Sequence, residues 1–239
     1  VITNNNELGD HNLAADRSGR GTGARGLFAG GNAPALKEEI EYISISTLGN
    51  SQDFGDLTDP KTGSAGCSSS TRAIFSNATL SGSRTNDIDF VTFASTGDAA
   101  DFGNSTVSVA YRTAISNSTR GVIAGGEGPT GTVIDVMDYI TIASTGNAED
   151  FGNLVGNRVS PGGGANSVRG IFAGGSSADE IMYITISSTG NTQDFGDLTA
   201  GTTTMTGCSN STRCVFGGIR NPGYGNTMEF LTIATTGNT

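Results

Sequence analysis

The chain has 239 residues and a net charge of -10, from 13 basic and 23 acidic side chains. This charge disfavours nucleic acid and anionic membrane surfaces as partners, because no local basic patch interrupts it. Glycine is the commonest residue at 37 copies, charged residues make up 15 %, and no run of 18 apolar residues exists. The balance is typical of a turn-rich β protein and predicts no helical membrane span.

The first expected elements set a pattern that the rest of the chain repeats. Residues 7–10 read ELGD, and an arginine-led strand from residue 25 reads RGLFAGG. The glycine pair ends this strand where the backbone needs a positive φ or a close approach. Residues 40–45 (IEYISI) alternate in side-chain character, which indicates a second strand and fits no helical face. The turn LGN and the segment DFGDLT then lead to the next arginine.

The same order recurs along the whole chain. Arginine-led strands begin at Arg25, Arg72, Arg120, Arg169 and Arg213, at intervals of 47, 48, 49 and 44 residues. A period of this size indicates a solenoid or a propeller and is near that of a four-stranded blade. The second copy departs from the others, with Ser76-Asn77 where the glycine pair belongs.

The two ends of the chain are in phase with each other. The last copy stops at TGNT, residues 236–239, just before a DFG segment would follow, and ELGD occupies the slot that DFGD fills at residues 194–197. All five sets of strands are complete only if the two ends meet, as in a toroidal propeller. An open solenoid, the alternative, would carry capping repeats. The sequence predicts one all-β domain over residues 1–239, a five-bladed β-propeller whose ring is closed by N- and C-terminal strands sharing a blade.

Two charged positions recur in all five copies. The arginines listed above are one set, and acids open the DFG slot at Glu7, Asp53, Asp101, Asp150 and Asp194. We expect each arginine to make a partly buried hydrogen-bonded contact with a carboxylate or with strand-end carbonyls, which would fix how neighbouring strands meet. The residues after the acids, Phe54, Phe102, Phe151 and Phe195 with Leu8 in the fifth slot, should fill the space between blades.

Few residues in the sequence indicate catalysis or metal binding. His11 is the only histidine, so neither a Ser-His-Asp arrangement nor a His-rich metal site is expected. The repeated DFG lacks the glycine-rich loop, lysine and catalytic loop of a kinase, and DFGD lacks the dense ligand ladder of a calcium loop. Three cysteines are too few for a disulfide framework, although a Cys208 to Cys214 bridge across one hairpin stays open. We therefore expect no catalytic residue, cofactor or metal.

The order of strand, glycine pair, variable loop, aromatic-bearing strand, turn and aromatic resembles the kelch motif. Tyr183 stands in the place of the motif's tyrosine and Phe195 in that of its tryptophan, a residue the chain lacks. This resemblance covers nearly the whole chain and implies β-propeller blades of a divergent kelch-like family. The phrase ITISSTGNTQDFGDLT also resembles repeats in virion structural and fibre-like proteins of tailed phages, especially marine cyanophages.

The loops after the glycine pairs differ among copies, and residues that break a repeat are the candidates for recognition. The candidate binding residues there are Lys37, Arg84, Glu127, Asp179, Arg220 and Tyr224. Drift in unconstrained loops explains the variation equally well.

The expected function is a non-enzymatic structural or adhesive module, a phage fibre, appendage or decoration protein in the virion or outside the cell. Its partners would be other virion proteins or a host surface glycan or protein. The alternative is a secreted kelch-like carbohydrate-binding protein or enzyme, and a third reading is an intracellular kelch-type adaptor. An enzyme should break the repeat with clustered His, Tyr, Cys or paired carboxylates, and the sequence shows no such cluster.

Overall fold

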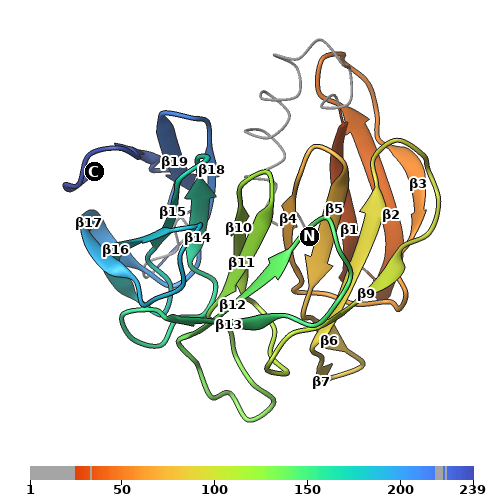
Figure 1. Cartoon of the computed structure of the whole chain (residues 1–239), viewed down its shortest axis with the longest axis horizontal. Helices are drawn as coiled ribbons and strands as arrows, with labels where there is room; N and C mark the ends of the chain where they lie inside the picture. Colours follow the sequence, from red (N-terminus) through yellow and green to blue (C-terminus); the bar gives the residue numbers. More distant parts are fainter. Residues whose placement is uncertain (1–24, 33, 219–222, 224) are drawn as a thin grey trace.

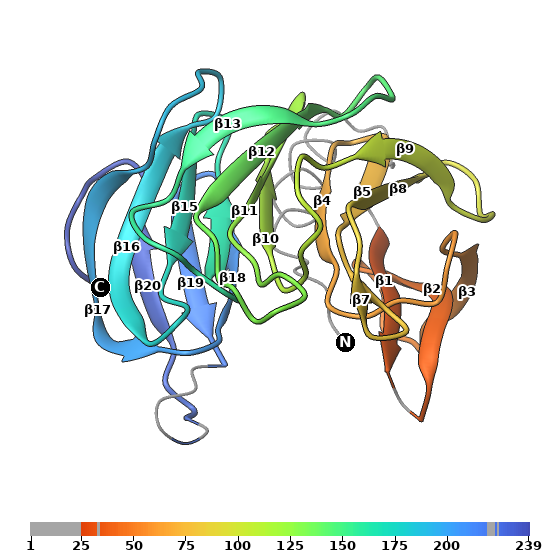
Figure 2. The ribbon, with the colours of Figure 1, turned by 90° about the horizontal axis from the view of Figure 1, so that it is seen from below.

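Five small antiparallel sheets make up the fold, which confirms the prediction of an all-β, five-bladed propeller. The computed structural model describes residues 25–32, 34–218, 223 and 225–239, and the regular elements in these ranges are all β-strands. Figures 1 and 2 show the sheets following one another along an arc in the order of the chain. We call each sheet a blade and number the blades in chain order.

Blades 2, 3 and 4 have four strands each, paired in chain order. Blade 2 contains β4 (Ala65–Ser68), β5 (Arg72–Ser76), β8 (Asp87–Thr92) and β9 (Ala100–Asn104). Blade 3 contains β10 (Thr113–Ser116), β11 (Arg120–Ala124), β12 (Val136–Thr141) and β13 (Glu149–Asn153). Blade 4 contains β14 (Gly162–Ala165), β15 (Arg169–Ala173), β16 (Ala178–Thr185) and β17 (Gln193–Thr202).

Blades 1 and 5 have three described strands each. Blade 1 contains β1 (Arg25–Asn32), β2 (Leu36–Ser44) and β3 (Gln52–Asp56), and blade 5 contains β18 (Thr206–Ser209), β19 (Arg213–Gly217) and β20 (Glu229–Thr232). A hairpin of β6 (Thr79–Leu80) and β7 (Ser83–Arg84) is inserted in blade 2. The predicted ring closure depends on residues 1–24, which lie outside the described residues, so closure stays a prediction.

Within each blade, the strands follow one another in chain order from the ring axis to the rim. The inner strands β4, β10, β14 and β18 contact one another, and β3, β9, β13 and β17 lie at the rim (Figure 1). The arginine-led segment is therefore the second strand of a complete blade, the aromatic-bearing segment the third, and the DFG segment the outer one. Each outer strand pairs with the third strand through a register shift; in blade 3, Asp138 faces Asp150 and Met137 faces Gly152. Phe151 is the extra residue of this β-bulge.

The hydrophobic core lies between blades. Each of four buried clusters combines side chains from two adjacent blades, and each contains one phenylalanine of a DFG segment. Phe151, for example, packs with Met137 of its own blade and with Phe172 and Ile184 of blade 4. The expectation that Phe54, Phe102, Phe151 and Phe195 fill the space between blades is confirmed.

The glycine pair is placed differently from the sequence expectation in two copies. Asn77 has a φ of 48°, close to the 67° of Gly125 at the same distance from its arginine, so the pair in blade 2 is replaced by Asn77-Ala78 and not by Ser76-Asn77. Asparagine tolerates this left-handed conformation better than most residues. In blade 1 the glycine pair does not end the strand, because a bulge lets β1 continue to Asn32.

Candidate functional site

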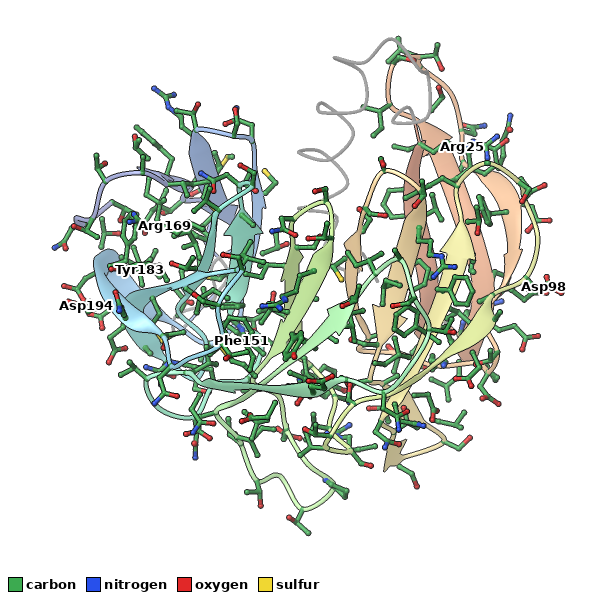
Figure 3. The ribbon with its side chains drawn as sticks, in the orientation of Figure 1. Arg25, Asp98, Phe151, Arg169, Tyr183 and Asp194 are labelled. Carbon is green, nitrogen blue, oxygen red and sulfur yellow. The ribbon has the colours of Figure 1, made fainter. Side chains whose placement is uncertain are left out.

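The repeat arginines stack on the aromatic side chain of the third strand in their own blades. Figure 3 shows Arg169 and Tyr183 together in blade 4. The guanidinium carbon lies 4.3 to 5.0 Å from the ring centroid in the five pairs Arg25–Tyr42, Arg72–Phe90, Arg120–Tyr139, Arg169–Tyr183 and Arg213–Phe230. This distance is within the range of a cation–π interaction.

Four of these arginines also donate a hydrogen bond to the next blade. The acceptor is the main-chain carbonyl of the residue just after the third strand: Arg25 to Phe93 (2.9 Å), Arg72 to Ile142 (3.1 Å), Arg120 to Ile186 (3.0 Å) and Arg169 to Ile233 (2.9 Å). Strand-end carbonyls were one of the two partners expected from the sequence. Each of these arginines therefore links two blades.

The repeat carboxylates, the other expected partner, lie elsewhere. Asp53, Asp101, Asp150 and Asp194 are exposed on the outer strands, and Figure 3 shows Asp194 at the rim. Glu7 lies outside the described residues. Their alternating position on the strand explains the difference, because the buried phenylalanine that follows each acid points to the opposite face of the sheet.

The TGN segment of blades 3 to 5, and the TGD segment of blade 2, bind the DFG strand of the preceding blade. Between blades 3 and 4, the amide of Gly190 donates to the carbonyl of Phe151 (2.7 Å) and that of Thr192 to the carbonyl of Asn153 (3.0 Å). The amide of Asn153 donates in return to Oδ1 of Asn191 (3.0 Å). We call this set of bonds the rim latch. It recurs between Gly97 and Phe54, Gly146 and Phe102, and Gly237 and Phe195.

The rim latch was missed by sequence reasoning, which treated TGN as a turn within one blade. The turn itself comes just before TGN, because Ser188 donates its amide to the carbonyl of Thr185 (3.1 Å), so the prediction that TGN forms the turn was wrong. The glycine of TGN and the Asx residue that follows bind the preceding blade instead. The sequence offered one indication of this contact between blades, which is that TGN and DFG recur together in the same copies.

Buried ion pairs join the segment between two blades to the later blade. Lys61 Nζ lies 2.7 Å from Asp89 Oδ2, and Arg112 Nη1 lies 2.5 Å from Asp138 Oδ2, with all four side chains nearly inaccessible to solvent. Burial lowers the pKa of the Arg112 guanidinium, and the charge and hydrogen bond of Asp138 oppose this effect. Glu229 in blade 5 has a related role, because it accepts hydrogen bonds from the amide and hydroxyl of Thr199.

The inner strands pack directly against one another. Ser116 Oγ of blade 3 donates to the carbonyl of Ser68 in blade 2 (2.7 Å), and Ser209 of blade 5 makes the same bond to Ala165 of blade 4 (2.8 Å). A β-carbon on Gly163 would lie 2.8 Å from Thr113 Oγ1, so glycine is needed for this close approach. The described inner strands therefore present hydroxyls and glycines near the axis, with no room for larger side chains at these contacts.

Neither a metal cluster nor a disulfide is found in the part of the chain that the structure describes. No group of three or more His, Cys, Asp or Glu side chains there could hold a metal ion. Cys208 and Cys214 are both thiols, because the register of the β18–β19 hairpin places Cys214 opposite Ser209 and Cys208 opposite Val215. The described ranges also contain no helix long and apolar enough to cross a membrane.

Three of the residues predicted for binding loops take part in local ion pairs or strands. Arg84 on β7 and Glu127 after β11 form an ion pair at 2.6 Å, and Arg84 lies 4.9 Å from the ring of the exposed Tyr111. We call Arg84, Tyr111 and Glu127 the loop-face cluster. Lys37 pairs with Glu39 at 3.0 Å on β2.

The other three predicted binding residues are placed as follows. Asp179 lies on β16, which begins only a few residues after the glycine pair of blade 4. Like Lys37, it therefore belongs to a strand and not to a loop, because the third strands of blades 1 and 4 start earlier than the sequence pattern indicated. Arg220 and Tyr224 lie outside the described residues.

A cavity of about 490 Å³ lies along β20 at the rim of blade 5. Its lining includes Phe195, Met228, Phe230 and Thr239. Met228 and Phe230 are exposed there, at 72 % and 55 %. No binding residue was predicted at this place from the sequence.

The chain matches no protein-family model and no curated protein. The propeller architecture is therefore shown by the structure alone.

Proposed function

We propose that the chain is a non-enzymatic structural or adhesive module that presents the loop face of a propeller for protein or glycan binding. The observation that supports this proposal is the use of the repeated residues. The arginines, the aromatic side chains and the TGN and DFG segments all make contacts within or between blades. The residues that the copies share are thus explained by folding, and the loops that differ among the copies are the candidates for recognition.

The loop-face cluster is the surface that we propose for binding. It combines an aromatic ring, a cation and a carboxylate on segments from two adjacent blades. Glu127 is tied to the start of blade 3 by main-chain hydrogen bonds with Ala110 (2.8 and 3.0 Å), which holds the cluster in place. Held polar groups beside an aromatic ring suit a sugar or a peptide ligand.

A virion component, in the form of a fibre, appendage or decoration protein of a tailed phage, is the specific role that we propose. Its support is the resemblance of the repeated phrase to repeats in such proteins. A divergent kelch-like relationship has similar support in the order of strands, glycine pair and aromatic residues. A secreted carbohydrate-binding protein is the second candidate, favoured by Tyr111, whose exposed ring lies beside Arg84.

Mass spectrometry of particles from the native source would test the virion role. We expect peptides of the chain to remain with infectious particles through successive density separations, in proportion to known structural proteins of the particle. Recovery only in the particle-free fraction would contradict the role. Turnover of any carbohydrate by the purified chain would contradict the non-enzymatic proposal.

Binding of the labelled protein to glycan arrays and to host cells would test the loop face. A Tyr111→Ala, Glu127→Ala double variant should lose at least about tenfold in affinity, the equivalent of one strong contact. Val168→Ala is the matched control, because Val168 is exposed in the turn between the first two strands of blade 4 and so lies on the opposite face. Equal loss in both variants would contradict a loop-face site.

A further inference from the structure

Three departures from the repeat meet at one place on the loop face. Among the described blades, the inserted hairpin of β6 and β7 belongs to blade 2 alone, and it carries Arg84. Tyr111 lies two residues before the inner strand β10, and Glu127 begins the loop that follows the glycine pair of blade 3. The ion pair and the ring contact described above join these three side chains into the loop-face cluster. The cluster therefore consists of groups that the repeat itself does not supply.

Tyr111 occupies a backbone position that suits a much smaller residue. The residue two places before the inner strand is left-handed in three blades: Gly63 (φ 74°), Tyr111 (φ 58°) and Ser160 (φ 51°). Bulky residues are rare in this conformation because it strains the backbone. The contacts that recur here are made by the main chain, since the amide of Tyr111 donates to the carbonyl of Gly63 (3.0 Å) and that of Ser160 to the carbonyl of Tyr111 (2.9 Å). The fold thus uses the backbone of Tyr111, and its ring has no counterpart in the other copies.

The ring of Tyr111 lies beside Gly63 and stays partly exposed. A β-carbon on Gly63 would be 2.7 Å from Cε1 of the ring, so glycine is needed to leave room for it. The tyrosine is 38 % exposed, and the guanidinium of Arg84 lies 4.9 Å from its centroid. An exposed aromatic surface held by its neighbours can pack against the C–H groups of a ligand at little cost in side-chain entropy.

The cation and the carboxylate of the cluster already neutralise each other. Arg84 donates from Nη1 to Thr79 Oγ1 and from Nη2 to Glu127 Oε1 (2.6 Å), and its side chain is only 14 % exposed. An anionic ligand would meet a paired guanidinium on a chain of net charge -10. A cationic ligand would have to displace Arg84 from both the ring and the carboxylate. The charges of the cluster therefore favour an uncharged ligand.

Two polar atoms of the cluster are left for such a ligand. Within the described ranges, Tyr111 Oη and Glu127 Oε2 make no hydrogen bond, and the Glu127 side chain is 30 % exposed. A phenol can donate and accept, and a carboxylate accepts. The main chain of Glu127, in contrast, is already bonded to Ala110, so it offers no edge to an extended peptide. Hydroxyl groups on a ligand match the two free atoms better than peptide groups do.

A buried asparagine anchors both sides of the cluster. Asn77 donates from Nδ2 to the carbonyl of Thr85 (3.1 Å), at the base of the hairpin that carries Arg84. The same Nδ2 donates to the carbonyl of Val107 (2.9 Å), on the segment that leads to Tyr111. The hairpin and this segment are therefore fixed to one side chain, which prepares the cluster for binding before a ligand arrives.

We propose that the loop-face cluster binds an uncharged pyranose unit of a glycan, an inference that rests on the binding role proposed above for the loop face. The C–H face of the sugar packs on the ring of Tyr111, and two of its hydroxyl groups hydrogen-bond with Tyr111 Oη and Glu127 Oε2. Arg84 is a positioning residue, which holds the ring and the carboxylate in place from the inserted hairpin.

Saturation-transfer NMR on the full chain tests the proposal, with the methyl pyranosides of glucose, galactose and mannose as probes. At least one of the three should receive saturation, mainly at the C–H protons of one face of its ring. Its Kd should change less than about twofold between about 0.05 M and about 0.5 M sodium chloride, because salt screens only charged ligands. A Kd that rises more than about tenfold over this range would show a charge-dependent contact and overturn the proposal.

Tyr111→Gly separates binding from folding. It should weaken pyranoside binding at least about tenfold. Its Tm should stay within about 2 °C of the native value, because relief of the left-handed backbone offsets the lost ring contacts. Ser160→Gly is the matched control, since it relieves the same conformation in blade 4 and should leave binding unchanged. A Tm lowered by more than about 6 °C in Tyr111→Gly would assign the ring to folding and overturn the proposal.

The outcomes distinguish the sugar site from the broader role of the loop face. Saturation of none of the pyranosides, or equal binding by the native chain and Tyr111→Gly, overturns the sugar site. If the native chain nevertheless binds host cells and the Tyr111→Ala, Glu127→Ala variant does not, the loop face is a binding surface for another class of ligand. If the double variant also binds host cells as the native chain does, both proposals fail.

Discussion

Gly152 on the outer strand of blade 3 lies against the main chain of Gly190 in blade 4, so close that a β-carbon on Gly152 would be 2.6 Å from the Gly190 carbonyl carbon. The backbone of Gly152 has a φ of +137°, which also favours glycine. Gly152→Ala should therefore lower the free energy of unfolding by more than about 2 kcal/mol, because the clash is with main chain that cannot swing aside. Chemical denaturation would measure the loss.

Gly190→Ala is the matched control for this prediction. Gly190 has a φ of +152°, but nothing lies within 4 Å of a β-carbon built there. It should show only the backbone cost, about 1 kcal/mol. Equal losses of stability in the two variants would contradict the close main-chain contact between Gly152 and Gly190.

Arg120 should stabilise the seam between blades 3 and 4 through both of its contacts. Its guanidinium lies 4.3 Å from the Tyr139 ring and donates to the carbonyl of Ile186. Arg120→Lys keeps the charge but loses the planar donor, and should cost about 1 kcal/mol. A double-mutant cycle with Tyr139→Leu should give a coupling of about 0.5–1 kcal/mol. Additive effects would show that the stacking contributes nothing.

The buried pair of Arg112 and Asp138 should be costly to break. Asp138→Ala leaves a guanidinium buried without its charge partner and should destabilise the protein by about 3–5 kcal/mol. Arg112 also donates to the carbonyls of Ile123 and Val136, so it cannot move readily into solvent. Lys37→Ala, which breaks an exposed pair, should cost at most about 0.5 kcal/mol. Thermal unfolding of the two variants separates these expectations.

Glu229 should make the stability of blade 5 depend on pH in the acid range. Burial alone would raise its pKa, but hydrogen bonds from Thr239 and Thr199 outweigh burial and lower the pKa below its ordinary value of 4.5. A folded pKa below the unfolded one means that the charged form stabilises the fold. This contribution is fully present above about pH 4.5 and is lost as the pH falls through the folded pKa.

The comparison with Glu229→Gln isolates this effect. The Tm difference between the native chain and the variant should be constant near neutral pH and shrink below about pH 4.5. Glu38→Gln, at an exposed position, should show no such trend. A difference that grows as the pH falls would contradict the predicted direction of the pKa shift.

Periodicity alone predicted the blades because each copy repeats the same strand signals. The repeat position of Phe151 was predicted to lie between blades, and the structure places it there. The repeat position of Arg120 was predicted to fix how neighbouring strands meet, and in the structure its hydrogen bond joins two blades. The partner of the arginine was left open between a carbonyl and a carboxylate. The partner depends on which face of the outer strand Asp150 occupies once the bulge is formed. The alternation of apolar and polar residues in the sequence does not predict this register shift.

The contacts that sequence reasoning missed depend on the rotation between blades. Gly190 and Phe151 are 39 residues apart and meet only because consecutive sheets turn by a regular amount around the axis. The pair of Lys61 and Asp89 is similar, since its members lie in a connecting segment and in the following blade. In several copies an acidic residue precedes the aromatic residue of the third strand, which could have indicated a buried ion pair. The cation that pairs with it, however, lies at a different number of residues from the repeat arginine in each copy.

The rim latch bears on how this protein behaves at high concentration. Outer strands are the usual place where β-proteins join into aggregates, because their second edge is open to a strand from another molecule. In blades 1 to 4 the next blade already bonds to that edge, as Gly190 and Thr192 do on β13. The TGN and TGD segments thus protect the outer edges of β3, β9, β13 and β17 from pairing with another molecule through main-chain hydrogen bonds. Other proteins use lysine or proline residues for this purpose.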